Sequence, residues 1–388
     1  MFLVQEFSKN VKRFRTLKGI SQHGLAAALG VSPQTVSKWE CGRGVPDIEN
    51  LCLLAQLLGV SVDALLDGSL GKKKIMIGID GGGSKNEFLL FTEDGMILGR
   101  ALRGGCSPTI IGLEACADLL ADGIEELLAV HSGVSAVFVG SAGFYTDKNG
   151  EKVKDLLCKR FPRLEIECRS DIVNVIFAAA CETDCLAAIC GTGSSVFCWE
   201  KEELSLFTGW GYMFDKYGSG YAIGRDALTA ALEASVGLKE KSALTDAVEE
   251  KLGVPVGDAI GKIYREGVSF VASFAPAVFE AYERGDHAAR EILEANATHL
   301  GYMITEAARR TPSARSVVIS GGLVTSHAVY ADMLEKRIPK GLSLIIGDLP
   351  QCIGACLGAA AIAGVKSAAL RDALRLAYAE NRASKSIE

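Results

Sequence analysis

The sequence predicts an α+β multidomain fold: a helical N-terminal bundle, then an α/β body in which one structural plan is used twice to make two lobes. Three observations support this fold class. Apolar residues recur at helical spacing over residues 9–66, and strand patterns alternate with helix patterns from residue 75 onwards. A glycine-rich hairpin opens each half of the α/β region, at 80–85 and at 191–195. A repeat of this size indicates internal duplication.

The composition is that of an ordinary folded protein. A length of 388 residues allows two or three domains with proper cores, and 49% of the residues are hydrophobic. The net charge of −6 argues against a chain that coats nucleic acid along its whole length. None of the twelve cysteines is spaced as Cys-x-x-Cys. The pairs Cys181/Cys185 and Cys352/Cys356 lie in apolar, alanine-rich segments, which favours small buried side chains over metal ligands.

The N-terminus has neither a basic region nor a cleavable apolar core, so no signal peptide is expected. The longest apolar run, 353–365, is too short and too rich in glycine and alanine to span a bilayer. We therefore expect a cytoplasmic protein with no membrane partner.

Residues 1–67 are predicted to form a compact bundle of five short helices. Val11, Phe14 and Leu17 share one face of the first helix. The second helix begins after Ser21 and ends at Gly30, and Ser32-Pro33 is a strong start for the third. A fourth helix follows Pro46-Asp47, and a short fifth one ends near residue 66. Residues 68–74, a Gly/Ser segment ending in three lysines, form the expected linker.

The second and third helices, joined by Gly30-Val31-Ser32, have the helix-turn-helix arrangement, whose second helix enters the DNA major groove. Val36 and Trp39 are expected to face inward. Gln34 and Lys38 can reach base edges, whereas Thr35, Ser37 and Arg43 suit phosphates. Within 9–66, seven Lys/Arg against four Asp/Glu leave a charge of +3. A small protein-interaction module is the alternative interpretation.

This segment resembles the lambda-repressor-like (XRE) helix-turn-helix family in its Ser21-Gln22, Leu29-Gly30-Val31-Ser32, Thr35 to Glu40 and Pro46-Asp47 motifs. The resemblance implies DNA as a partner. It places Gln22 with the other expected DNA contacts, and it implies a homodimer, since such heads usually read two half-sites.

The region 75–184 is predicted to form the first lobe. The expected strands cover 75–79, 85–91, 96–102, 134–139 and 164–168, and the expected helices cover 113–130, 152–160 and 172–181. The order β-β-β-α-β-α-β-α describes a ribonuclease-H-like unit. The pattern restarts at 185–189 and continues to 388 as the second lobe, with a helical insertion at 221–310, strands at 317–319 and 342–346, and C-terminal helices.

The first hairpin contains Asp80, the glycines Gly81 to Gly83, and Ser84. Consecutive glycines allow bare N–H groups to approach a ligand, and a carboxylate at a strand tip suits a hydrated metal. A plain chain reversal is the alternative. A strand rather than a helix follows, so the hairpin is neither a Walker loop nor a dinucleotide fingerprint.

The duplicated plan resembles the actin, sugar-kinase and heat-shock-chaperone ATPase superfamily. Within it, 75–365 looks most like the BadF/BadG/BcrA/BcrD ATPase group that contains N-acetylglucosamine kinase. The motifs that carry the resemblance are Asp80 to Lys85, Cys190 to Ser195, Gly209 to Tyr212, Gly218 to Tyr221 and Ser320 to Gly322.

The resemblance implies ATP and Mg²⁺ as cofactors and a sugar as the acceptor. It places Mg²⁺ at Asp80 and the catalytic base at Asp171, which by its sequence position could also be a helix cap. The implied phosphate and adenosine contacts are Gly81, Gly82, Gly83, Ser84, Lys85, Gly191, Thr192, Gly193, Ser194, Gly321 and Gly322.

The sugar side departs from the family pattern. The family carries an Asn-containing loop where this chain has 106–109, and Gly-Asp-Glu-Gly-Ser where this chain has Asp215-Lys216-Tyr217-Gly218-Ser219. Lys216 is a donor only, so it cannot accept sugar hydroxyls as an aspartate would. The remaining expected sugar contacts are Ser107, Gly209, Trp210, Gly211 and Asp215.

Three functions are compatible with these motifs. The first is a sugar kinase of N-acetylglucosamine-kinase type carrying a DNA-binding head. The second is a transcription regulator whose kinase-like body only senses a sugar or nucleotide. The third is an ATPase activator of a dehydratase, another branch of the group, although the paired cysteines of that branch are not evident here.

Overall fold

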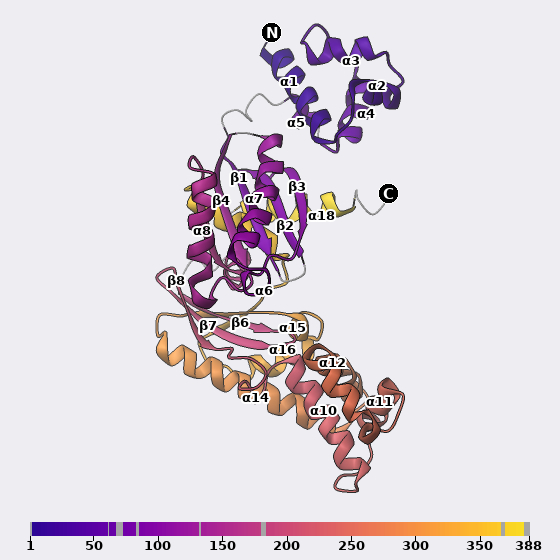
Figure 1. The fold of residues 1–388 in the computed structure, drawn as a ribbon, viewed down its shortest axis with the longest axis vertical. Coiled ribbons are helices and arrows are strands. Elements are labelled where there is room, and N and C mark those ends of the chain that lie inside the picture. Colours follow the sequence, from indigo (N-terminus) through magenta and orange to yellow (C-terminus); the bar gives the residue numbers. More distant parts are fainter. Residues whose placement is uncertain are drawn as a thin grey trace. The chain divides into compact units, whose positions relative to one another are not determined.

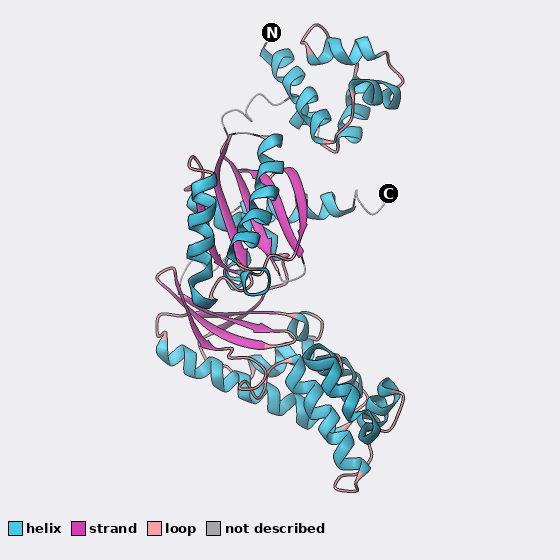
Figure 2. Ribbon diagram, viewed as in Figure 1, coloured by secondary structure: helices cyan, strands magenta, loops and turns pink. Residues whose placement is uncertain are grey.

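The computed structural model describes residues 2–60, 62–66, 73–82, 85–131, 133–179, 184–365 and 369–383. The chain divides into two compact units, the first made of 1–174 with 351–388 and the second of 175–350. Figures 1 and 2 show helices alone at the N-terminus and mixed sheets with helices in the remainder. The predicted fold class, a helical bundle followed by a duplicated α/β body, is confirmed.

The N-terminal bundle consists of five helices: α1 (Phe2–Leu17), α2 (Gln22–Leu29), α3 (Pro33–Glu40), α4 (Ile48–Leu58) and α5 (Val62–Leu66). Ser21 caps α2 by accepting the N–H of Gly24, and Gly30 ends that helix in the left-handed conformation at φ 67°. Val36 and Trp39 of α3 are buried in the bundle core, as predicted.

The first sheet has five strands in the order β3-β2-β1-β4-β5. Its strands are β1 (Ile75–Gly81), β2 (Lys85–Thr92), β3 (Ile97–Gly104), β4 (Val134–Ser141) and β5 (Glu165–Ser170). The first three are antiparallel, whereas β4 and β5 run parallel to β1. Gly81 pairs with Ser141, and Ser141 pairs with Ser170. The three parallel strands therefore end side by side.

Helices cover both faces of this sheet. The first unit also contains α6 (Pro108–Ile111), α7 (Leu113–Val130), the 3₁₀ turn η2 (Thr146–Lys148), α8 (Asn149–Arg160), α17 (Gln351–Ile362), α18 (Leu370–Ala383) and the start of α9 (Asp171–Ala178), which the unit boundary divides after Asn174. Ile77 and Ile79 share a core with α7 and α8. Gly78, between them, faces α17, where a Cβ atom would lie 2.4 Å from the backbone nitrogen of Cys356.

The assignment of 351–388 to the second lobe is therefore wrong. The yellow C-terminal helices lie against the first sheet in Figure 1, and α17 packs on β1 and β4. Glycines permit this packing, because a Cβ at Gly358 would lie 2.8 Å from the ring of Phe138 on β4. Helical periodicity predicts the helix but does not say which sheet it covers.

The second sheet repeats the plan of the first, with the order β10-β9-β6-β7-β8. Its strands are β6 (Cys185–Cys190), β7 (Ser194–Glu200), β8 (Glu203–Thr208), β9 (Ser316–Ser320) and β10 (Ser343–Ile346). Strand β8 was not predicted. It pairs antiparallel with β7 at the edge of the sheet and has no fully buried residue, so it lacks the apolar signal of a core strand.

Helices of the second unit pack around one large core. They are α10 (Gly220–Ser235), α11 (Ala243–Leu252), η3 (Val256–Ala259), α12 (Ile260–Ala272), α13 (Ala275–Glu283), α14 (His287–Arg310), α15 (Gly322–Thr325) and α16 (Ala328–Glu335). The first six lie in the predicted helical insertion. Within the described part of the chain, every helix is too short or too polar to cross a bilayer.

Candidate functional site

Acidic and amide side chains gather where the parallel strands of the first sheet end. Asp80 is the penultimate residue of β1, and Asp171 directly follows β5 and opens α9. Asn174, one turn further along α9, donates from Nδ2 to Oδ1 of Asp80 at 2.9 Å and to the carbonyl of Gly140 at 3.1 Å. The pairing of the strand ends thus brings the two predicted carboxylates to one edge of the sheet.

Both carboxylates are harder to ionise than usual. Burial raises the pKa of Asp80 from 3.8 to about 6, with a further rise from the charges of Asp171 and Glu87 that the Asn174 bond opposes. Burial also raises the pKa of Asp171, against bonds from the Ser170 hydroxyl and the Ile172 N–H, both to Oδ1. Two buried carboxylates that repel each other favour a bound cation.

Asn174 was not predicted as a site residue. It is fully buried, and its Oδ1 has no hydrogen-bond partner among the described residues. The signal available in the sequence was its spacing, since residues three apart on a helix share a face and Asn174 follows Asp171 by three. That spacing identifies a neighbour of the predicted base but not its contact with Asp80.

The first glycine hairpin is partly described. Gly81 ends β1, and a Cβ atom there would lie 2.4 Å from the Ser141 hydroxyl, so only glycine fits. The N–H of Gly82 donates to the carbonyl of Lys85 at 2.9 Å, which closes the turn. Lys85 is exposed at the start of β2. Two predicted phosphate contacts, Gly83 and Ser84, lie outside the described residues.

Ser107 lies near this edge of the sheet. It is buried, and its hydroxyl is 2.8 Å from that of Thr109. A Cβ at Gly143, in the loop after β4, would lie 2.7 Å from the Ser107 hydroxyl. The predicted sugar contact therefore sits close to the end of β4 with its hydroxyl already engaged.

The second glycine hairpin belongs to the second unit and joins β6 to β7. Two of its carbonyl oxygens accept hydrogen bonds from the start of α10. The N–H of Gly220 donates to the carbonyl of Gly191 at 2.7 Å, and the N–H of Tyr221 donates to the carbonyl of Thr192 at 3.0 Å. The N–H of Gly191 donates to the carbonyl of Gly193 at 2.9 Å. The start of α10 thus fixes the hairpin's shape, while Thr192 and Gly193 remain exposed.

Two cavities flank this hairpin, and Gly191 and Thr192 line both. The larger, about 470 Å³, is lined by Gly191, Thr192, Gly220, Ser269, Ala272, Ser273, Ala275, Pro276, Gly322, Leu323, Ser326 and His327. The smaller, about 310 Å³, is lined by Ile189, Gly191, Thr192, Gly193, Ser194, Ser195, Gly209, Gly211, Tyr212, Asp215 and Ser219. Two of the predicted phosphate contacts, Gly191 and Thr192, thus lie between the two cavities.

The predicted glycine pair after β9 has two different roles in packing. Gly321 has φ 112°, and a Cβ there would lie 2.4 Å from the carbonyl oxygen of Cys190. Gly322 lines the larger cavity, and nothing lies within 4 Å of the position its Cβ would take. Gly321 is therefore required for packing, whereas Gly322 leaves space in the cavity.

The loop after β8 is held by Asp215. Oδ1 of Asp215 accepts from the Thr208 hydroxyl at 2.8 Å, and Oδ2 accepts from the N–H of Gly211 at 2.6 Å. Asp215 lines the smaller cavity, but both of its oxygens already bind its own loop, which weakens its predicted role as a replacement sugar ligand. The loop carries the predicted Trp210, whose side chain is 65% exposed.

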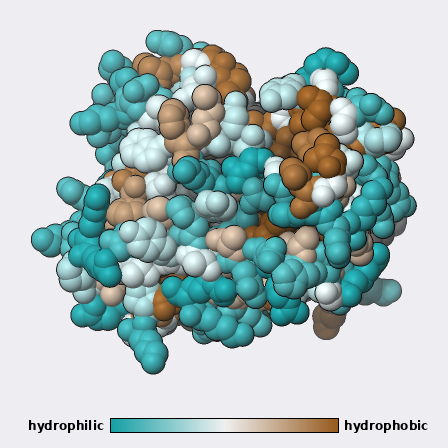
Figure 3. All heavy atoms as spheres, turned by 90° about the horizontal axis from the view of Figure 1, so that it is seen from below, coloured by the Kyte–Doolittle hydropathy of each residue, from teal (hydrophilic) through white to brown (hydrophobic). Residues whose placement is uncertain are grey.

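Other large hydrophobic side chains on the second unit are also exposed, among them Met213 and Phe214 of the same loop. The face drawn in Figure 3 is mostly hydrophilic but carries distinct hydrophobic patches.

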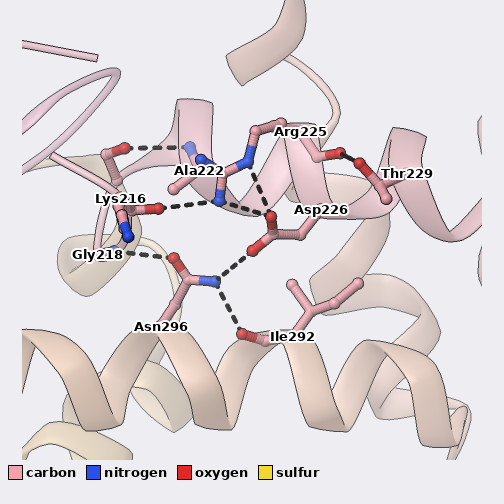
Figure 4. Close-up of polar contacts among 9 residues, drawn as sticks. Lys216, Gly218, Ala222, Arg225, Asp226, Thr229, Ile292 and Asn296 are labelled. Atoms are coloured by element: carbon pink, nitrogen blue, oxygen red, sulfur yellow. Dashed lines mark hydrogen bonds and ion pairs between the residues drawn. The ribbon is translucent and has the colours of Figure 1, made fainter. Parts of the chain in front are cut away.

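The turn at residues 216–218, which belongs to the predicted sugar side, is held by a polar network (Figure 4). Nη2 of Arg225 donates to the carbonyl of Lys216 at 2.9 Å, and Arg225 also pairs with Asp226. Oδ1 of buried Asn296 accepts the N–H of Gly218 at 2.8 Å, while its Nδ2 donates to Asp226 at 3.2 Å. These bonds fix the backbone of 216–218 relative to α10 and α14.

The helical bundle presents the predicted reading helix with its polar residues outward. Gln34 and Lys38 of α3 are exposed, Thr35 and Ser37 are half-buried, and Arg43 after the helix is exposed. The Thr35 hydroxyl lies 2.8 Å from that of the cap residue Ser32, so it is partly engaged.

Gln22 differs from the other predicted DNA contacts. Its Nε2 donates to Oε2 of Glu40 at 2.7 Å, and Arg15 pairs with the same carboxylate. The second N–H of Nε2 and the carbonyl oxygen of its amide remain for another partner, and that N–H can still donate to a phosphate.

Comparisons with known proteins identify relatives of both regions. The sequence model of the BadF/BadG/BcrA/BcrD ATPase family matches residues 77–363, and a helix-turn-helix model matches 11–65. An N-acetylmuramic acid/N-acetylglucosamine kinase of Clostridium acetobutylicum is 29% identical over 235 residues, which cover 58% of this chain and 77% of that protein. An N-acetyl-D-glucosamine kinase of Dictyostelium discoideum is 26% identical over 288 residues, which cover 69% and 90%.

Among solved structures, a ROK-family transcriptional regulator homologous to the E. coli MLC protein matches with a TM-score of 0.52 at 15% identity. The match covers 97% of this chain and 98% of the regulator. At this identity the likeness concerns the fold alone.

Proposed function

Because the chain belongs to the BadF/BadG/BcrA/BcrD ATPase family and begins with an XRE-type helix-turn-helix domain, we propose that it is a DNA-binding sugar kinase. The kinase body would bind Mg²⁺ and ATP and transfer the γ-phosphate to a hydroxyl of an amino sugar, with Asp171 as the base. The kinases to which it is similar supply the acceptor class.

The first unit would hold the metal and take the proton. Mg²⁺ is usually bound through one or two carboxylates, with waters and phosphates completing its shell, and the buried carboxylate of Asp80 fits that requirement. When bound, the ion would neutralise charge on the transferring phosphate. The bonds to Asp171 from Ser170 and Ile172 both reach Oδ1, so we assign Oδ2 to the acceptor hydroxyl. A raised pKa suits a general base.

The second unit would hold the nucleotide. Backbone N–H groups of the hairpin from Gly191 to Ser194 would bind phosphates, as glycine-rich turns do. The larger cavity beside the hairpin, with Gly322 leaving room on its wall, would take the adenosine.

The observation that carries the proposal is the pairing of Gly81 with Ser141 and of Ser141 with Ser170, which brings Asp80 and Asp171 to one sheet edge. The test is ADP release by the full-length protein with Mg-ATP and a panel of amino sugars, among them N-acetylglucosamine and N-acetylmuramic acid. We expect Asp171→Asn to abolish turnover and to retain Mg-ATP binding. A variant that turns over at the wild-type rate would refute the assigned base.

The DNA-binding role rests on the exposed polar face of α3. Gln34→Ala should reduce discrimination between operator and random DNA, whereas Arg43→Ala should weaken both and lower the salt dependence of binding. The operator must first be identified, by selecting the DNA sequences that the wild-type protein binds from a random pool. Equal loss of specific and non-specific affinity in Gln34→Ala would contradict base reading by that residue.

A second function, sugar sensing without turnover, is favoured by one observation. The turn that carries Lys216 and Tyr217 is fixed by Arg225 and Asn296, and the resemblance to the family implies that these two residues stand where relatives carry an acidic pair. A sugar that raises the melting temperature and changes operator affinity, with no ADP released, would support the sensor. Sugar-dependent ADP release would support the kinase.

A further inference from the structure

A histidine in the larger cavity is held by a parallel aromatic stack. His327 immediately precedes α16, and its ring lies 3.8 Å from that of Phe279 on α13, with an interplanar angle of 3°. Phe279 is buried in the core, where the ring of Tyr330 meets it edge-on at 5.9 Å. Phe279 is therefore a fixed support, and the plane of the imidazole follows from it.

The supported ring fronts the cavity. One face of His327 is covered by Phe279, so the cavity that His327 lines meets its other face or its edge. Across the described residues, the imidazole nitrogens form no hydrogen bond or ion pair. The bonding capacity of this ring is thus available to a ligand.

The cavity suits an uncharged planar group. Its volume of about 470 Å³ lies within the usual range for small-molecule sites. Its lining residues include no lysine, arginine, aspartate or glutamate, and the half-buried His327 has its pKa lowered by burial, so it is neutral at pH 7. The hairpin residues Gly191 and Thr192 form one part of the wall. Phosphates therefore suit the hairpin, and an uncharged base suits the part that His327 lines.

We propose that His327 is the base-recognition residue of the nucleotide site, and that a purine stacks on the ring face opposite Phe279. The inference rests on the proposed binding of a nucleotide by the second unit and adds the residue that selects the base. A purine offers a larger stacking face than a pyrimidine, so the site prefers ATP and GTP over CTP and UTP.

The test is calorimetric binding of the four Mg-nucleoside triphosphates and of inorganic tripolyphosphate to the full-length protein. Three variants are compared: His327→Ala, His327→Leu, which fills similar space without an aromatic face, and His327→Phe, which retains the face. Stacking of a base on an aromatic side chain corresponds to roughly fivefold to a hundredfold in affinity. We expect the Ala and Leu variants to lose about tenfold for ATP and to lose the purine preference, and the Phe variant to keep both.

His287→Ala is the matched control, because His287 is exposed at the start of α14 and does not line the cavity. Tripolyphosphate affinity should be equal in all variants. If the wild type binds neither ATP nor tripolyphosphate, the proposed nucleotide site itself fails. If it binds ATP but shows no purine preference, or if the Leu variant matches the wild type or the Phe variant falls with it, the role of His327 is overturned. Should the Ala variant not fold, the comparison of Leu with Phe still decides.

Discussion

Replacing Asp80 by asparagine should stabilise the metal-free protein while removing its affinity for Mg²⁺. Burial raises the pKa of Asp80 from 3.8 to about 6. The folded state thus holds this proton more tightly than the unfolded chain, so the contribution of Asp80 to stability is fully present below about pH 4 and is lost as the pH rises through about 6. The corresponding loss is about 0.5 kcal/mol at pH 4 and up to about 3 kcal/mol at pH 7.5. Asparagine avoids this loss, and its amide oxygen can still accept the bond from Asn174.

The assay is thermal unfolding in EDTA at several pH values, with Mg-ATP binding measured in parallel. At pH 7.5 the variant should melt higher by roughly 6–12 °C at most, and the difference should shrink towards zero at pH 4. Asp155→Asn, an exposed site on α8, is the control and should show neither effect. A variant that is less stable than the wild type at pH 7.5, or a difference between variant and wild type that does not shrink from pH 7.5 to pH 4, would refute the reasoning.

Three further substitutions test the packing that supports the sites. Glu40→Gln should destabilise the bundle by about 3 kcal/mol, since Glu40 is a nearly buried partner of Arg15. Bonds from Arg15 and Gln22 outweigh burial and lower the pKa of Glu40, so in the wild type this stability should disappear as the pH falls through that lowered value, as monitored by circular dichroism. Gly354→Ala should lose at least about 2 kcal/mol in urea unfolding, because its Cβ would lie 1.8 Å from the carbonyl of Asn174; an unchanged midpoint would contradict the packing of α17. Tyr378→Phe removes a donor 3.1 Å from both oxygens of buried Glu87 and should cost about 1–3 kcal/mol, with faster hydrogen exchange in α18 as the local measure.

Local features of this chain were predictable because they depend on neighbours in sequence. Ser21 and Ser32 were expected as caps, and each accepts the backbone N–H three residues on, as the chemistry of helix ends requires. The burial of Val36 and Trp39 followed from helical spacing. The hairpin at Gly81 was evident from its glycines, and its tight contact with Ser141 explains why a side chain is excluded.

Long-range features were not predictable in the same way. Nothing in the local pattern of α17 indicates that it packs on β1, since the contact depends on Gly78 meeting Cys356 across almost three hundred residues. Asn174 belongs to a predicted helix, but its bond to Asp80 depends on the pairing of β1 with β4 and of β4 with β5. The position of Asp215 in the sequence suggested a sugar ligand, but it gave no sign that both carboxylate oxygens also bind the residue's own loop.

The choice between kinase and sensor depends on whether the sugar-acceptor side of the proposed site supports phosphate transfer as well as the metal and nucleotide side does. Asp80 is kept buried beside Asp171 although ionising it there destabilises the free protein, and such a strained carboxylate is expected where a cation or a proton transfer requires it. On the proposed acceptor side, the resemblance to the family implies that Lys216 and Tyr217 stand in place of an acidic pair. Metal and nucleotide binding should therefore persist whatever the acceptor is. Whether the protein turns over is decided only by the ADP-release assay with the panel of amino sugars. If Mg²⁺ binds with equal affinity to the wild type and to Asp80→Asn, the assignment of the metal to Asp80 is refuted.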